Sequence, residues 1–174
     1  MTHGVGWVGH YCFSYDEHYD PQNLSFGRLL ACNEFVLEPG AGFGRHRHAG
    51  IDVVTTVLDG VLTHVTPTGL EERGPGSYVL RTGGGMEHDE RNGTGRLVRF
   101  VQAWFPAGEG APPAELAVRP GESVTLAGRA FALVVEGTAD LGGAALARGD
   151  SARVEPGEVE LTGLTPAVLL AWDC

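Results

Sequence analysis

Short runs of β-branched and aromatic residues alternate with glycine and proline turns along this chain. The run 53–58 is followed by Asp59-Gly60, and a second run, 61–65, begins directly after that pair. Asp-Gly between two such runs is the strongest short-range signal for a β-hairpin. Among the 174 residues, 27 are Gly and 10 are Pro, and no stretch keeps a helical period. We therefore predict an all-β protein of short strands and tight turns.

A weak internal repeat divides the sequence into two parts. Three short segments recur: Pro39-Gly40 as Pro120-Gly121, Leu58-Asp59-Gly60 as Val135-Glu136-Gly137, and Ala103-Trp104 as Ala171-Trp172. Residues 107–114 between the copies are small and rich in Gly and Pro, which is typical of a linker. We predict an N-terminal domain over residues 1–106, a linker over 107–114 and a C-terminal domain over 115–174, each domain a small barrel or sandwich.

The chain is acidic, with a formal net charge of -10, and all of its basic residues are Arg. Because nucleic acids demand clustered positive charge, we expect no direct nucleic-acid binding. The longest apolar runs, 131–135 and 167–172, fall far short of the roughly 20 residues of a membrane-spanning helix, so we expect no membrane attachment. Residues 1–7 lack the features of a signal peptide. We expect a cytoplasmic protein with a small-molecule partner, and the oligomeric state stays open.

The cysteines and two tryptophans are expected to have structural roles. The three cysteines, Cys12, Cys32 and Cys174, are an odd number without C-x-x-C spacing. This pattern argues against a disulfide framework or a zinc knuckle and predicts buried or terminal thiols. Trp104 and Trp172 lie at corresponding places in the repeat, inside apolar runs. We expect both to pack in the core.

All seven histidines precede residue 89, and four candidate ligands form two spaced pairs. One residue separates His46 from His48, and one separates His88 from Glu90. Residues i and i+2 of a strand point to the same face, so each pair presents two donor atoms side by side. Two such pairs on neighbouring strands could close on one ion with three imidazoles and one carboxylate. Such a set leaves positions open in an octahedron, as catalytic metal sites do.

The predicted ligand set contains nitrogen and oxygen but no thiolate. It suits Fe(II), Mn(II), Ni(II) or Zn(II) and disfavours Cu(I) and iron–sulfur clusters. We favour one divalent ion, Fe(II), with Zn, Mn or Ni as alternatives. Glycines at positions 40, 42 and 44, and at 83–85, lead into the two pairs. Glycine tolerates positive φ and close backbone approach near a ligand, which supports the metal hypothesis.

Other polar residues of the first half are assigned no ligand role. We expect His64, in the second arm of the Asp-Gly hairpin, to be a polar surface residue. The alternative is a place in the cavity or a hydrogen bond that orients a ligand. His10 is expected to pack, with contact to the site as its alternative. The acidic cluster Asp16, Glu17 and Asp20 is expected to be a solvated surface.

Two segments resemble the motifs of the cupin superfamily. Gly40, followed after five residues by His46-Arg47-His48, fits the first cupin motif. The segment 83–88, with Asn92 four residues later, fits the second motif, apart from Thr82 where proline is usual. More closely, the chain resembles the pirin branch of the cupins. That likeness covers nearly the whole first half and, more loosely, the second, and rests on the segments 10–15, 19–21, 39–60 and 81–90.

The resemblance implies a bicupin, with two tandem jelly-roll β-barrels of which the second is shortened. It also implies one mononuclear metal, usually iron, in the N-terminal barrel. Mapped onto matching positions, the ligands are His46, His48, His88 and Glu90. Asp52 occupies the acidic position of the first motif, where many other cupins have their carboxylate ligand. Because pirins place that carboxylate in the second motif, Asp52 is the reserve ligand.

The same resemblance implies that the second barrel is degenerate and metal-free. The chain is shorter than the pirin pattern, especially after residue 111. The positions that correspond to the ligands, near Thr125 and Val159, carry no histidine.

By resemblance, the expected function is an Fe(II)-dependent dioxygenase that acts on a flavonol, another polyphenol or an enediol-type small molecule. Glu90 would then be catalytic, because a carboxylate beside the ion can take the hydroxyl proton of the substrate. Two alternatives remain at this point. One is a non-catalytic, metal-bearing regulatory or binding protein. The other is a non-redox metal-dependent isomerase, cyclase or hydrolase.

Overall fold

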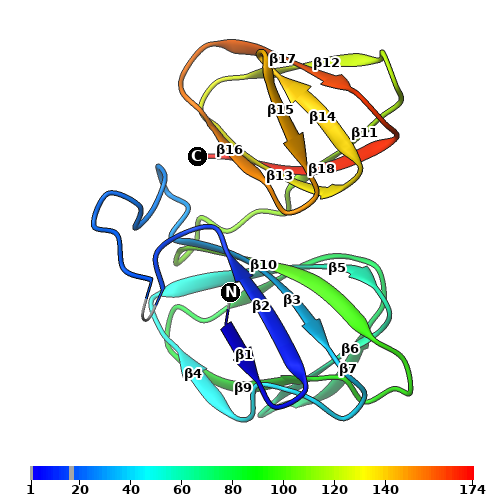
Figure 1. Cartoon of the computed structure of the whole chain (residues 1–174). Coiled ribbons are helices and arrows are strands. Elements are labelled where there is room, and N and C mark those ends of the chain that lie inside the picture. The colour runs from blue at the N-terminus through cyan, green and yellow to red at the C-terminus, as the bar shows by residue number, and fades with distance from the viewer. Residues whose placement is uncertain (1, 16–17) are drawn as a thin grey trace. The chain divides into compact units, whose positions relative to one another are not determined.

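A computed structural model describes residues 2–15 and 18–174 of the chain. These residues form β-strands joined by turns and loops, with no helix among them (Figure 1). The all-β prediction is confirmed. Accordingly, no described segment is a helix with the length and apolarity that crossing a bilayer requires. Of the predicted acidic cluster, Asp20 is exposed, whereas Asp16 and Glu17 lie outside the described residues.

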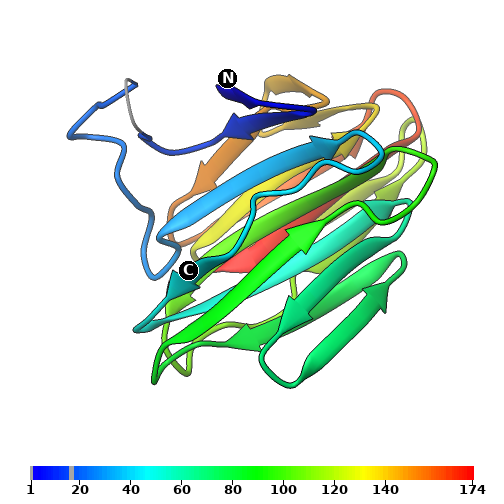
Figure 2. The same cartoon turned by 90° about the horizontal axis from the view of Figure 1, so that it is seen from below.

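The chain separates into two compact units, Met1–Pro112 and Pro113–Cys174. The first unit holds a six-stranded sheet in the order β1-β2-β3-β10-β5-β8 and a four-stranded sheet in the order β4-β9-β6-β7. Figure 2 shows these strands from a second direction, with β3, β10 and β5 lying side by side as antiparallel neighbours. The strands are β1 (Thr2–Gly4), β2 (Trp7–Tyr11), β3 (Ala31–Leu37), β4 (His46–His48), β5 (Ile51–Asp59), β6 (Leu62–Thr66), β7 (Gly69–Arg73), β8 (Gly76–Arg81), β9 (Met86–Arg91) and β10 (Val98–Pro106).

The second unit holds two four-stranded antiparallel sheets, in the orders β11-β18-β13-β16 and β12-β17-β14-β15. Each order equals that of the first unit with eight added to every strand number, once β1 and β2 are set aside. The predicted pair of tandem cupin-type barrels is therefore confirmed. The strands are β11 (Ala114–Val118), β12 (Ser123–Ala127), β13 (Ala130–Glu136), β14 (Thr138–Leu141), β15 (Ala144–Ala147), β16 (Ser151–Val154), β17 (Glu158–Gly163) and β18 (Ala167–Asp173).

Two glycines at corresponding turns show how closely the units match. Gly60 has φ +80° and Gly137 has φ +70°, a region that L side chains rarely adopt. A Cβ at Gly60 would lie 2.5 Å from the Leu97 carbonyl oxygen, and one at Gly137 would lie 2.0 Å from the Pro166 carbonyl oxygen. The backbone approach leaves room only for glycine at both turns. The Asp59-Gly60 turn and the corresponding turn at Gly137 therefore have the same structure and the same requirement for glycine.

This match corrects the predicted correspondence of the two tryptophans. The glycine contacts align Leu97 with Pro166, and counting along the two strands then aligns Ala103, not Trp104, with Trp172. A shift of one residue moves a side chain to the other face of a strand. Trp172 is buried, as predicted, but Trp104 is half-buried and lines a pocket. The core-packing prediction is therefore wrong for Trp104.

Each unit has its own apolar core. In the first unit, Phe35, Leu37 and Phe100 pack with Val57, Leu62 and Val98. In the second unit the core is built from Val, Leu and Ala of seven different strands. Cys12, Cys32 and Cys174 remain thiols, as predicted. The aromatic core of the first unit leads directly into the site described next.

Candidate metal centre

Three neighbouring strands of the first unit bring the predicted ligands together. His46 of β4 lies directly opposite His88 of β9, and Glu90 of β9 lies directly opposite His64 of β6. Directly opposed residues of an antiparallel pair share one face of the sheet. His48 is two residues beyond His46 and therefore points the same way. The register between neighbouring strands thus brings together side chains from positions as far apart as 46 and 90.

The imidazoles form one tight group. His46, His48 and His88 offer ligand atoms that lie within 4.8 Å of one another. Glu90 is adjacent, because its Oε2 is 3.4 Å from His46 Nε2 and its Oε1 is 3.3 Å from His88 Nδ1. It belongs to a second such group, with His64 and His88. The four-residue ligand set itself stays a prediction.

Hydrogen bonds fix the direction of two of these side chains. His46 donates from Nδ1 to the carbonyl oxygen of Gly44 at 2.9 Å, which leaves its Nε2 for another partner. Gln102 donates from Nε2 to Oε1 of Glu90 at 2.9 Å and contacts the Thr55 hydroxyl at 3.3 Å. Oε1 of Glu90 therefore accepts a hydrogen bond from Gln102, and Oε2 is available to another partner.

Burial sets the charge state of the group. Desolvation, reinforced by the neighbouring His46, lowers the pKa of His48 to about 4. Desolvation and the surrounding imidazoles lower the pKa of His88 to about 3. Desolvation raises the pKa of Glu90 to about 8, although the hydrogen bond from Gln102 opposes that shift. At pH 7 these two imidazoles are neutral and present lone pairs, and the Glu90 carboxyl keeps its proton until a cation replaces it.

The residues fit a divalent cation. His88 Nε2 and Glu90 Oε2 are both buried and have no hydrogen-bond partner among the residues that the structure describes. Buried polar atoms are normally paired, so two such atoms in one cluster need a partner. Neutral imidazole nitrogens and a carboxylate oxygen are donors that Fe(II), Ni(II), Mn(II) and Zn(II) accept. A metal ion bound here would satisfy both atoms at once.

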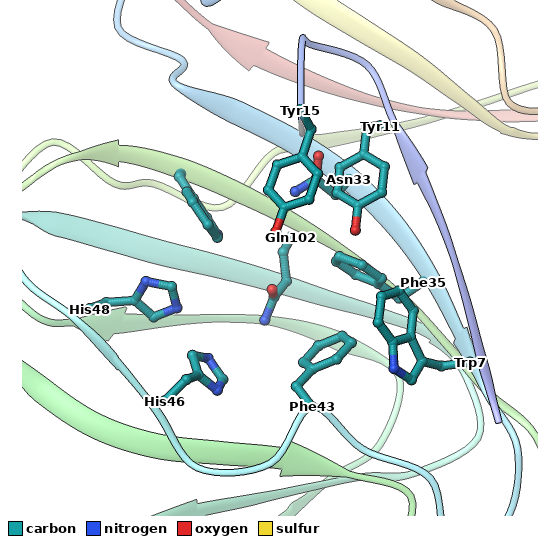
Figure 3. A pocket seen from close by; sticks show the side chains of 10 residues that line it. Trp7, Tyr11, Tyr15, Asn33, Phe35, Phe43, His46, His48 and Gln102 are labelled. Atoms are coloured by element: carbon teal, nitrogen blue, oxygen red, sulfur yellow. The ribbon is translucent and has the colours of Figure 1, made fainter. Parts of the chain in front are cut away.

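An aromatic pocket of about 300 Å³ opens beside the histidines. Figure 3 shows His46 and His48 on one side of it, Trp7, Phe35 and Phe43 on the other, and Gln102 between them. Tyr11 and Tyr15 stack with their ring centroids 4.4 Å apart, and Tyr15 is 48% exposed at the rim. Asn33 and Trp104 complete the lining. The pocket suits a flat, mostly apolar molecule that carries a few polar groups.

Two other sequence candidates lie elsewhere. Asp52 is buried, and its Oδ2 accepts hydrogen bonds from the backbone of Gly108 at 2.9 Å and of Gly110 at 3.1 Å. Arg81 is a further partner of the same oxygen. Asp52 therefore anchors the start of the segment predicted as a linker, and it belongs to neither ligand group. His10 is exposed, so its predicted packing role is wrong.

The surface prediction for His64 is also wrong, because this residue is 3% exposed and contacts His88. Alternation along the strand predicted that His64 points to the opposite side of the sheet from Thr63 and Val65. It did not predict which of the two sides is buried. Gln102 was not predicted at all. The sequence indication for it is that Gln102 is the one polar residue in the otherwise apolar run 100–105. A polar side chain that is buried in such a run needs a hydrogen-bond partner.

The fold is that of a cupin whose first unit carries groups of side chains that could hold a metal ion, and comparison with known proteins identifies the family. The pirin family model matches residues 3–105. A pirin-like protein from Caulobacter vibrioides is 31% identical over 176 residues, covering 93% of this chain and 76% of that protein. The chain belongs to the pirin family.

Other relatives carry an enzyme name. The quercetin 2,3-dioxygenase of Escherichia coli K12 is 34% identical over 114 residues, which cover 62% of this chain and 49% of that protein. A putative quercetin 2,3-dioxygenase from Pseudomonas aeruginosa is 31% identical and covers 70% of this chain and 57% of that protein. The chain thus matches about half the length of these enzymes.

Solved structures confirm the bicupin fold. The pirin YhhW from Escherichia coli, determined in complex with nickel(II), superposes with a TM-score of 0.88 at 19% identity over 98% of this chain and 92% of that one. A quercetin 2,3-dioxygenase from Acinetobacter baumannii superposes with a TM-score of 0.74 at 13% identity, over 97% of this chain and 79% of that one. At these identities the likeness establishes the fold.

Proposed function

We propose that this chain is an iron(II)-dependent dioxygenase that acts on a flavonol, another polyphenol or an enediol-type small molecule. The observation that carries the proposal is the position of His46 and His48. They belong to the imidazole group and also line the aromatic pocket of about 300 Å³. A molecule in that pocket lies against the side chains that would hold the metal.

Two further facts support the proposal. Relatives of this family are named quercetin 2,3-dioxygenase, and the structure of one family member was solved with nickel(II). We extend the activity and the metal dependence to this chain, with His46, His48, His88 and Glu90 as ligands. The donor set accepts Zn, Mn or Ni as well, and we favour iron because the reaction consumes dioxygen.

Bound at this cluster, iron(II) supplies a Lewis-acidic centre and the redox couple that dioxygen chemistry requires. The protein supplies a proton acceptor. Glu90 Oε2 is the oxygen that Gln102 does not occupy, so it would hold the ion and would also take the hydroxyl proton of the substrate when it is not bound to the ion.

The lining of the pocket orients the substrate. Trp7 and Phe43 pack edge to face at 5.4 Å between ring centroids, and Trp104 packs in the same way against His48 at 4.9 Å. Aromatic walls of this kind bind a flat ring by dispersion and by burial of apolar area. The amides of Asn33 and Gln102 are the polar groups of the lining that can meet substrate hydroxyls.

Oxygen consumption tests the proposal. Iron-loaded protein is mixed with quercetin in air and, in parallel, under argon. We expect oxygen uptake that requires both metal and substrate, and that falls at least about 100-fold in the Glu90→Gln variant. Turnover that proceeds equally under argon would contradict the proposal and favour the non-redox alternative. Binding of quercetin without any turnover would favour the regulatory alternative.

A further inference from the structure

His64 is a buried histidine with no assigned task in the proposed reaction. It lies on β6, is 3% exposed, and faces Glu90 across the sheet. Its Nε2 is 2.7 Å from His88 Nδ1. The two rings are nearly perpendicular, at 83°, with their centroids 5.0 Å apart. An imidazole is therefore held in direct contact with a predicted metal ligand, on the side away from that ligand's Nε2.

The contact has the geometry of a hydrogen bond. The 2.7 Å separation of His64 Nε2 and His88 Nδ1 falls within hydrogen-bond range. His64, His88 and Glu90 also form a possible ligand group, so the experiment below tests whether His64 is a ligand itself.

The position of the shared proton follows from the other nitrogen of His88. His88 Nε2 is buried, and no atom of residues 2–15 or 18–174 forms a hydrogen bond with it. A proton on that atom would be a buried, unpaired N–H donor, which is costly. The proton therefore belongs on Nδ1, which donates it to His64 Nε2. The lone pair of His88 Nε2 is then left for a cation. His46 has the same arrangement, because its Nδ1 donates to the Gly44 carbonyl oxygen.

We propose that His64 is a positioning residue for the metal site. By accepting the Nδ1–H of His88, it fixes the tautomer and the ring direction of this ligand. The role rests on the metal site proposed above, and it gives His88 the partner that ligating histidines usually have.

Packing alone does not require a histidine at this position. His64 faces Glu90 on the neighbouring strand, and in the second unit the corresponding pair is Leu141 and Leu161. Both leucines belong to the core of that unit. Leucine therefore fills the same place in the same fold when no ligand has to be oriented.

Two variants separate positioning from packing. His64→Leu places the residue of the second unit here and removes the acceptor, whereas His64→Gln carries an amide oxygen that can still accept from His88. The affinity of the full-length protein for nickel(II) is measured by competition with a chromophoric chelator. We expect His64→Leu to bind about 10- to 100-fold more weakly than wild type, and His64→Gln to recover most of that loss. His10→Leu, a change at an exposed residue, is the control and should bind as wild type does.

Histidine ¹⁵N NMR of the metal-free protein gives a second readout that needs no metal. We expect His88 as the Nδ1–H tautomer in wild type and in His64→Gln, and a mixture of tautomers in His64→Leu. Equal nickel affinity in all variants would overturn the positioning role, and so would His88 protonated on Nε2 in wild type. Equal loss in both His64 variants would also overturn it, because His64 would then be a ligand itself. If wild type binds no nickel, the metal site fails, and the NMR measurement still decides the hydrogen bond.

Discussion

The two units place opposite kinds of side chain at the same positions of one strand arrangement. The register of β9 with β4 and β6 corresponds to that of β17 with β12 and β14. It pairs each polar residue of the first unit with an apolar one of the second: His46 with Leu126, His64 with Leu141, His88 with Val159, and Glu90 with Leu161. Leu126, Leu141 and Leu161 are buried in the core of the second unit, and Val159 packs against it.

The difference shows what the fold needs and what it does not need. A cupin-type barrel closes its interior with aliphatic residues at these positions, as the second unit does. Buried ionisable groups destabilise a protein unless they are paired. The first unit nevertheless buries His64, His88 and Glu90 to 3% exposure or less. Stability does not explain this choice, whereas the proposed binding of a cation would.

The largest expected effect is on metal content. Replacing His88 by Ala removes a central member of the imidazole group, so bound metal should fall from about one ion per chain to near zero. Elemental analysis after dialysis measures this. The matched change in the other unit, Val159→His, should add no metal, since its neighbours are aliphatic. A His88→Ala protein that keeps its full metal content would show that His88 is not a metal ligand.

Exchanging the residues at the corresponding positions 90 and 161 should affect stability in only one of the two units. Leu161→Glu places a carboxyl in an aliphatic core and should lower the free energy of unfolding by about 3 kcal/mol or more, from lost apolar burial and an unpaired polar group. Glu90→Leu should not destabilise the metal-free protein and should abolish metal binding. Urea denaturation of metal-free samples measures both. A comparable loss in the two variants would show that Glu90 serves stability after all.

Metal removal should destabilise the chain by a smaller amount. Free metal at 100 times its dissociation constant stabilises the folded state by about 2.7 kcal/mol. For a chain of this size, chelation should lower the melting temperature by roughly 5 to 10 °C. Hydrogen exchange should place the lost protection in β4, β6 and β9 and leave β12, β14 and β17 unchanged. Equal changes in both sets of strands would contradict a site confined to the first unit.

The smallest expected effect is the change in stability of the metal-free protein between pH 7 and 8. Burial raises the pKa of Glu90 from 4.5 to about 8, so between these values the folded state holds a proton that the unfolded chain has released. Stability therefore falls as the pH rises through this window, by at most about 1.4 kcal/mol per unit. His48 and His88, whose pKa values are lowered from 6.5, act in the opposite direction only below about pH 6.5. Between pH 7 and 8, Glu90→Gln should flatten the slope, and an identical slope in this variant would exclude Glu90 as its source.

Periodicity and turn residues act locally, so they predicted the all-β class and the repeat, whereas the pirin-type bicupin was predicted by resemblance to a family. The spacing of His46, His48, His88 and Glu90 also predicted side chains that the structure brings close together. Tertiary partners were harder to predict. The burial of His64 depends on the register between β6 and β9. This register cannot be predicted from the residues of either strand alone. The wrong alignment of Trp104 with Trp172 also reflects an unknown register, since a shift of one residue moves a side chain to the other face of a strand.

Anomalous diffraction from crystals of the metal-loaded protein tests the proposed metal site most directly. We predict one strong peak per chain, at about 2.0 to 2.2 Å from the Nε2 atoms of His46, His48 and His88 and from an oxygen of Glu90, and none in residues 113–174. A peak at other residues, or a loaded crystal in which these four side chains do not share one ion, would contradict it.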